Sequence, residues 1–288
     1  MTASALALVL IAAVLHATWN FLAKRLGGGA GAVWLYSTLS MVCYAPVAAA
    51  LVWFTRPGLS AAGLGFMAGS AVLHVGYFIA LQRGYRGGDL SVVYPLARGT
   101  GPLLAALAAI TIFGERPGLA AMAGALLIGA GILVLAGGRA LVGQGQAAAP
   151  AGVRYGLLTG VFIAVYTLWD KQAVAVIGVP PILMDWGSNV GRSLLLLPAA
   201  WLRRGEVSRH WTQHRPLVLG IALLSPLAYI LVLTAMVFTP VSYVAPAREI
   251  SILIGTAMGA RWLAEDRPRL RMAGATAMVV GLIALAAG

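Results

Sequence analysis

Hydrophobic and polar positions along this chain alternate in long blocks rather than in short periods. Apolar stretches of about 20 residues recur throughout the sequence, and charged residues, glycines and prolines separate them. Because a helix needs about 20 apolar residues to cross a bilayer, each block predicts one membrane-spanning helix. The expected fold is all-α, a polytopic membrane protein of ten transmembrane helices. The predicted helices are 3–23, 31–54, 60–82, 91–113, 118–137, 153–178, 181–202, 216–238, 241–263 and 269–287.

The composition agrees with this pattern and excludes an ordinary soluble protein. Of the 288 residues, 60% are hydrophobic and 10% are charged, with a mean hydropathy of +0.90, whereas soluble domains are about 25% charged. A net charge of +12 would indicate nucleic-acid binding in a soluble protein. Here the basic residues lie mostly between apolar blocks, so we expect no nucleic-acid partner and interpret these residues as topology signals.

The two halves of the sequence are copies of each other. Met122-Ala123-Gly124-Ala125 recurs as Met272-Ala273-Gly274-Ala275, an offset of 150 residues (272 − 122). The same offset maps Trp19 onto Trp169, Arg98 onto Arg248 and Glu115 onto Glu265. Chance matching in Ala- and Gly-rich helices is the alternative, but several identities at one offset favour duplication. We therefore predict five-helix repeats at 1–137 and 153–288, joined by a linker at 138–152.

An odd number of helices in each copy implies that the copies enter the membrane from opposite sides, as inverted repeats do. The basic residues follow this plan. A first set of connections, those after the first, third, fifth, seventh and ninth predicted helices, carries fourteen lysines and arginines, whereas the connections on the opposite face carry only Arg56 and Arg116. Positive charge collects on cytoplasmic connections, so both termini are expected on the other side. The fourteen basic residues of the first set are Lys24, Arg25, Arg83, Arg86, Arg139, Arg154, Arg203, Arg204, Arg209, Arg215, Arg261, Arg267, Arg269 and Arg271.

Seven charged residues lie inside predicted spans, where each costs about 2.5–3.5 kcal/mol or more at the bilayer centre. They are Arg98, Asp170, Lys171, Asp185, Arg192, Arg248 and Glu249. Such residues face a cavity or a partner, and the two symmetry-related arginines, Arg98 and Arg248, have the guanidinium fork that suits a carboxylate. Ion pairing is the alternative: Arg248 with Glu249 or Asp170, and Arg192 with Asp185.

Two predicted helices carry matching polar and aromatic faces. Helix 3–23 has His16, Trp19 and Asn20 at positions i, i+3 and i+4, and helix 153–178 has Tyr166, Trp169 and Asp170 at the same spacing. Each residue alone could be structural, but the repetition predicts two faces that meet across a central, partly aqueous cavity.

Four further helices contribute candidates to the same cavity. Helix 60–82 adds His74 and Tyr77, and Tyr229 is the counterpart of Tyr77 in the second copy. Pro95 and Pro246 lie next to the two arginines, and an intramembrane proline permits bending, so both are predicted hinges.

The sequence lacks the motifs of catalysis. It has no Gly-rich phosphate loop ending in Gly-Lys-Ser/Thr and no paired-histidine zinc helix. Its only cysteine, Cys43, lies in an apolar block and allows neither an intrachain disulfide nor a thiolate metal site. We therefore expect no catalytic residues, no metal, no cofactor and no enzyme activity.

Five stretches of the sequence form a recognisable set of motifs. They are His16-Ala17-Thr18-Trp19-Asn20 with Lys24, Tyr94-Pro95-Leu96-Ala97-Arg98, Phe113-Gly114-Glu115-Arg116-Pro117, Ala245-Pro246 and Ala264-Glu265-Asp266-Arg267-Pro268. With these motifs the sequence resembles the EamA-like ten-helix branch of the drug/metabolite transporter superfamily. Within that branch it is similar to YddG-type exporters of aromatic amino acids, which implies a central cavity and alternating access by rocking of the two halves. Helix 153–178 departs from helix 3–23 in carrying Tyr166 and Asp170 where His16 and Asn20 stand, so a symmetric site is not expected.

The function expected is export of small amphipathic metabolites, aromatic or other apolar amino acids, across the inner membrane. Aromatic rings would stack on the substrate, and an arginine would hold its carboxylate. Efflux of cationic drugs or other metabolites, an intramembrane enzyme and a non-transporting membrane subunit are the alternatives, and proton coupling through Asp170 or His16 is left open. The expected partners are a small solute and the lipid bilayer. We expect a monomer, and a dimer through helices 118–137 and 269–287 is left open. The candidate binding residues are His16, Trp19, Asn20, His74, Tyr77, Tyr94, Arg98, Tyr166, Trp169, Asp170, Tyr229 and Arg248.

Overall fold

The computed structural model describes residues 1–288 except 28, 88–89, 136–149 and 255–267. The described residues form helices and no strand, which confirms the all-α prediction. Five of the helices are long and apolar enough to cross a membrane by length and composition. The helices are α1 Ala3–Leu26, α2 Ala30–Thr55, α3 Ala61–Gly87, α4 Leu90–Ile112, α5 Leu119–Leu135, α6 Pro150–Ala175, α7 Pro181–Leu202, α8 Arg204–Gln213, α9 Arg215–Phe238, α10 Val241–Arg248 and α12 Pro268–Ala287.

The connection predicted between 202 and 216 is wrong in one respect, because it contains the ten-residue helix α8. This segment is too short and too polar to span a membrane. Val207 and Trp211 nevertheless lie four residues apart and share one face, where both are partly buried. Packing of that face on neighbouring helices stabilises α8. Such tertiary contacts are not visible in the pattern of long apolar blocks. Most of the predicted linker, 138–149, lies outside the described residues, and α6 begins at Pro150.

The prediction of one continuous helix over 241–263 is also wrong, because α10 ends at Arg248. Pro246 has no N–H to donate and disturbs the helix around it. The Glu249 amide bonds the Pro246 carbonyl at 3.0 Å, and the Ile252 amide bonds the Glu249 carbonyl at 2.9 Å. This three-residue spacing is tighter than that of an α-helix and interrupts the span at its charged residues. Residues 255–263 of the predicted helix lie outside the described part of the chain.

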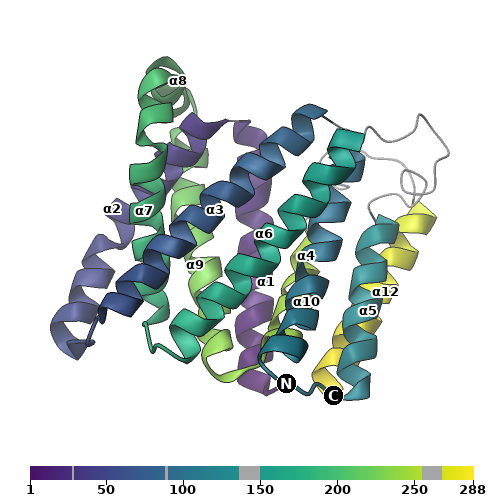
Figure 1. The fold of residues 1–288 in the computed structure, drawn as a ribbon. Helices are drawn as coiled ribbons and strands as arrows, with labels where there is room; N and C mark the ends of the chain where they lie inside the picture. The colour runs from purple at the N-terminus through teal and green to yellow at the C-terminus, as the bar shows by residue number, and fades with distance from the viewer. Residues whose placement is uncertain (28, 88–89, 136–149, 255–267) are drawn as a thin grey trace.

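The helices pack in pairs that exchange under the repeat symmetry. Helix α3 of the first copy packs on α6 of the second, and the equivalent contact is α9 of the second copy on α1 of the first. Two further contacts join equivalent helices of the two copies, α2 with α7 and α5 with α12. Figure 1 shows the last pair side by side at one edge of the bundle. The ten-helix count stays a prediction, since residues 255–267, which precede α12, lie outside the described part of the chain.

Glycines fix the direction of the α5–α12 pair. A Cβ at Gly124 would lie 2.5 Å from the carbonyl oxygen of Gly281, and one at Gly131 would lie 2.7 Å from that of Gly274. Numbers rise along α5 as they fall along α12, so the helices are antiparallel, and the 150-residue offset exchanges the two contacts. Equivalent helices that run in opposite directions are the property of inverted repeats. The glycine faces of α5 and α12 therefore pack on each other within one chain.

The two ends of the bundle differ in charge. Both termini lie at one end (Figure 1), where the Met1 amino group donates to the Ala286 carbonyl at 3.3 Å. Helix α8 lies at the opposite end (Figure 1) and brings Arg204 and Arg209 to it. The described basic connections thus gather away from the termini, in line with the charge pattern of the sequence.

Candidate functional site

Three buried charges from two helices form the centre of the candidate site. Arg98 Nη2 lies 3.1 Å from one oxygen of Glu249, and Arg248 Nε lies 3.4 Å from the other. Glu249 is fully buried, and Arg98 and Arg248 are 8% and 3% exposed. Two guanidinium groups thus share one carboxylate, which leaves one positive charge in excess within this trio. Arg248 Nη2 is buried and has no hydrogen-bond partner among the described residues, so an incoming anion would find an unused donor there.

His16 of α1 extends this trio. Its Nε2 lies 3.1 Å from Arg98 Nη2, and its Nδ1 lies 3.2 Å from the indole nitrogen of Trp19. Arginine and indole nitrogens only donate hydrogen bonds, and a neutral imidazole accepts at one nitrogen. His16 can therefore satisfy one of these donors at a time.

Aromatic rings from α3, α6 and α9 meet beside the charges. The His74 ring stacks on Tyr166 with centroids 4.3 Å apart, and Tyr229 lies edge-on to His74 at 5.6 Å. Tyr77 approaches Tyr166 edge-on at 6.0 Å. Arg248 is close enough to Tyr166 and Tyr229 to interact electrostatically with both. In this conformation the rings contact one another, so this part of the predicted cavity is filled by side chains.

Asp170 of α6 adds a buried carboxyl group to the aromatic cluster. It is fully buried, and the Tyr229 hydroxyl donates a hydrogen bond to its Oδ2. Its Oδ1 has no hydrogen-bond partner within the described ranges. Tyr229 therefore bonds Asp170 and also lies close enough to Arg248 to interact with it electrostatically, so the candidate site holds groups of opposite charge.

Helix α7 carries a polar ladder of its own rather than the direct Arg192–Asp185 pair that the sequence suggested. Arg192 donates to the Asn189 amide oxygen at 2.8 Å, and the Asn189 amide nitrogen donates to Asp185 Oδ2 at 2.9 Å. An amide thus bridges the two charges. Ser188 on the same helix accepts from Ser70 of α3, which ties the ladder to the helix that carries His74.

The two tryptophans lie against neighbouring helices instead of joining the aromatic cluster. Trp169 donates from its indole nitrogen to the Phe66 carbonyl at 2.8 Å and packs on that ring at 4.5 Å. Trp19 packs in an apolar group with residues of α2 and α9. Asn20 is exposed and donates to the His16 carbonyl of its own helix. Of the two predicted faces, the structure therefore places His16, Tyr166 and Asp170 in the candidate site. Trp19, Asn20 and Trp169 lie at the edge of that site.

Comparison with known proteins identifies the family of this fold. The model of the EamA-like transporter family matches residues 3–137 and 150–287. The chain belongs to the EamA-like transporter family. It is therefore a multi-pass membrane transporter of small solutes in the drug/metabolite transporter superfamily, and members of this family are transporters rather than enzymes.

Solved structures support the fold of this EamA-family chain. One of 28 matching chains, described only as the crystal structure of a protein, superposes with a TM-score of 0.76 at 20% sequence identity. The match covers 99% of this chain and 96% of the other. No curated protein matches the sequence.

Sequence reasoning assigned no role to two residues that clamp the α9–α10 connection of this transporter. Glu115, which precedes α5, accepts from the amides of Val241 at 2.8 Å and Ser242 at 2.9 Å, the first two residues of α10. Lys171 of α6 donates to the carbonyls of Met236 and Thr239 at the end of α9, at 2.5 and 3.0 Å. A carboxylate at a helix N-terminus and an ammonium at a C-terminus both complement the helix dipole.

The recurrence of Glu115 as Glu265 is the one signal that could have indicated such a clamp, and Glu265 lies outside the described residues. The predicted hinge Pro246 lies in α10, three residues before the break at Glu249. Pro95 and Tyr94 belong to α4, which is continuous through them. Glu249, which the sequence offered only as a pairing partner for Arg248, is the residue that joins both arginines.

Proposed function

We propose that this transporter exports small amphipathic metabolites, namely aromatic and other apolar amino acids, across the inner membrane by alternating access. The likeness of its sequence to YddG-type exporters supports this substrate class, and the basic end of the bundle supports placing that end in the cytoplasm. The same orientation puts both termini on the non-cytoplasmic side.

The observation that carries the proposal is the buried Arg248 beside the aromatic cluster. Its Nη2 has no hydrogen-bond partner in the described part of the chain, and the Arg98–Glu249–Arg248 trio has one positive charge in excess. A substrate carboxylate would supply that donor with an acceptor and neutralise the charge. The rings of His74, Tyr166 and Tyr229 offer apolar faces to an aromatic or aliphatic side chain.

Asp170 gives the site a second charge of the opposite sign. Its Oδ1 is buried without a hydrogen-bond partner among the described residues, so it could accept from a substrate ammonium group. An amino acid presents a carboxylate and an ammonium on one carbon, which suits a site where Arg248 and Asp170 both interact with Tyr229. A cationic drug would use Asp170 alone and would meet the excess positive charge of the arginines.

The transport cycle would work by reversible closure of the two ends of the bundle. In this conformation Glu115 and Lys171 hold the α9–α10 connection at the end where the termini lie. The interruption at Glu249 gives α10 a place to pivot, as discontinuous helices do in other transporters with inverted repeats. Loss of the Glu115 bonds and movement of α10 would open that end.

Flux into proteoliposomes tests the proposal. Radiolabelled tryptophan and leucine should show saturable uptake, and a cationic dye should show none. Arg248→Gln should lower kcat/KM for tryptophan about 10- to 150-fold, since a hydrogen bond to a charged group contributes about 1.5–3 kcal/mol. Arg209→Gln on the exposed surface of α8 is the matched control and should retain wild-type flux. Absence of amino acid flux together with dye efflux would overturn the assignment in favour of drug export.

Proton coupling is tested by the same vesicles under an imposed pH gradient. Of the two candidates, Asp170 is the better placed to exchange a proton, because its Oδ1 is unbonded while His16 lies between two donors. A pH gradient should drive uphill flux in the wild type and fail to do so in Asp170→Asn. Flux that does not respond to the gradient would exclude coupling.

A further inference from the structure

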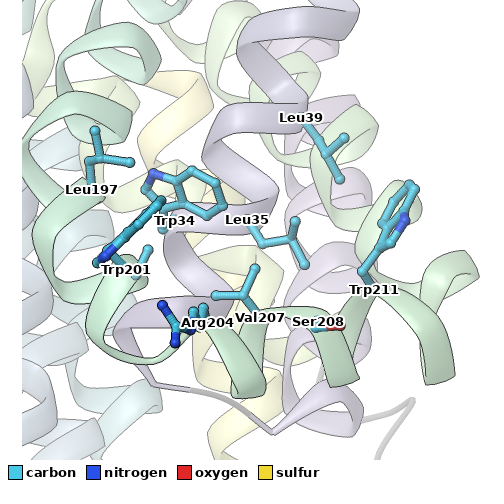
Figure 2. Close-up of a pocket in the computed structure, with 10 residues that line it drawn as sticks. Trp34, Leu35, Leu39, Leu197, Trp201, Arg204, Val207, Ser208 and Trp211 are labelled. Carbon is cyan, nitrogen blue, oxygen red and sulfur yellow. The ribbon is translucent and has the colours of Figure 1, made fainter.

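A pocket lies away from the charged centre, at the end of the bundle that carries α8. It has a volume of about 360 Å³ and is formed by α2, α7 and α8, within the size range of about 300–1,000 Å³ that small-molecule sites have. In Figure 2, Trp34 and Trp201 lie on one side of the pocket, Trp211 lies on the other, and Arg204 lies at its edge. Helix α2 comes from the first copy and α7 and α8 come from the second, so the pocket joins both repeats.

The surroundings of the pocket belong to the membrane rather than to water. Next to it on α7, Leu194, Trp201 and Leu202 are 66%, 68% and 86% exposed. Large apolar side chains that are so exposed face acyl chains in a membrane protein, and tryptophan is enriched where the chains meet the headgroups. A short helix with basic residues and an apolar face is typical of a helix that lies in the interface.

The charge around the pocket selects the kind of lipid. Arg204 lines the pocket, is exposed, and has no hydrogen bond or ion pair within the described residues. The one acidic residue of α8, Glu206, is engaged by Arg203 at 3.8 Å and His210 at 3.7 Å. Arg215 adds a guanidinium 4.9 Å from the centre of the Trp211 ring. A phosphate with a net negative charge therefore meets uncompensated positive charge at the rim of an apolar pocket.

We propose that this pocket binds an anionic phospholipid of the leaflet at the α8 end. An acyl chain lies against Trp34, Leu39 and Leu197, and the phosphate lies at Arg204. Because the lipid contacts both copies next to the α2–α7 contact, it holds them together at this end. Helix α8 is anchored there as well, since Glu206 accepts from the Gly29 amide in the α1–α2 connection.

Fluorescence quenching by brominated lipids tests this site in the purified protein in detergent micelles. Phosphatidylglycerol and phosphatidylcholine with the same brominated acyl chains are titrated separately. Phosphatidylglycerol should quench at about fivefold lower concentration than phosphatidylcholine, since one arginine near an anionic headgroup contributes about that factor. Arg204→Gln should remove the difference. Arg209→Gln, the same change on the same helix outside the pocket, should retain it.

A second matched pair locates the quenching. Trp201→Phe should abolish a large part of the component specific for phosphatidylglycerol. Trp53 is 77% exposed at the other end of α2, and Trp53→Phe should leave the phosphatidylglycerol-specific quenching intact. Equal quenching by both lipids in the wild type would overturn the proposal, as would equal losses in the two arginine variants. Displacement of the lipid by glycerol phosphate alone would also overturn it, because a free phosphate site needs no acyl chain.

Discussion

Replacing Glu249 by glutamine keeps its shape and removes the carboxylate that two buried arginines share. Glu249 is fully buried, and its oxygens lie 3.1 Å from Arg98 and 3.4 Å from Arg248. Removing one partner of a buried ion pair costs about 3–5 kcal/mol, because the remaining charge loses its compensation. We therefore expect Glu249→Gln to lower the free energy of unfolding by at least that amount.

The measurement is reversible unfolding in mixed detergent–dodecyl sulfate micelles, extrapolated linearly to zero denaturant. Glu206→Gln is the matched control, because Glu206 is partly exposed beside Arg203 at 3.8 Å, where an ion pair contributes about 0–1 kcal/mol, and glutamine keeps an oxygen that accepts from the Gly29 amide. Bound tryptophan gives a second readout in the same assay. At 100 times its Kd, tryptophan raises the free energy of unfolding by about 2.7 kcal/mol in a protein that binds it only when folded. Tryptophan should bind Glu249→Gln more tightly than the wild type, and tryptophanamide, which lacks the carboxylate, should not. Equal losses in both glutamine variants would refute the reasoning.

Two further predictions concern the scaffold and the clamp. Gly124→Ala should lower the free energy of unfolding by about 1–3 kcal/mol, because its Cβ would lie 2.5 Å from a backbone oxygen of α12. Gly65→Ala in α3 has open space around the new methyl group and should raise that free energy by up to about 1 kcal/mol in the same titration. Glu115→Gln weakens the cap of α10, at a cost of about 0.5–2 kcal/mol. It should speed maleimide labelling of Thr239→Cys in a Cys43→Ala background, and an unchanged rate would contradict the clamp.

The cost of charge in lipid made the central residues predictable from the sequence. Arg98, Asp170 and Arg248 stood out because each lies in an apolar block, and all three are buried in the structure. The antiparallel direction of α5 and α12 agrees with the inverted repeat that the sequence predicted, whereas their packing on each other within one chain was not predicted from the repeated glycines. These inferences needed only helix length and solvent energetics, which are local properties of the sequence.

Other features depend on contacts between distant segments and could not be predicted. Trp169 has the spacing of a cavity residue, but Gly69 of α3 leaves room for its ring, which therefore packs between helices. The helix α8 forms because its apolar face docks on α2, where Val207 lies against Gly31, 176 residues earlier in the chain (207 − 31). The sequence shows Glu249 next to Arg248 and so indicates that pair, but it does not show that Arg98, which is distant in the chain, also pairs with Glu249.

A doubled and inverted scaffold places equivalent positions near one axis, and the side chains at those positions then decide what the site can hold. In this protein the equivalent positions differ in chemistry, because Tyr166 corresponds to His16 and Asp170 corresponds to Asn20. His16 contacts Arg98, whereas Asp170 contacts Tyr229. Each copy thus supplies one arginine, Arg98 or Arg248, and the second copy adds the carboxyl group of Asp170 at the position equivalent to Asn20. A symmetric solute would gain nothing from that difference. A solute with a carboxylate and an ammonium needs it, because the two groups must be bound by opposite charges at the same time.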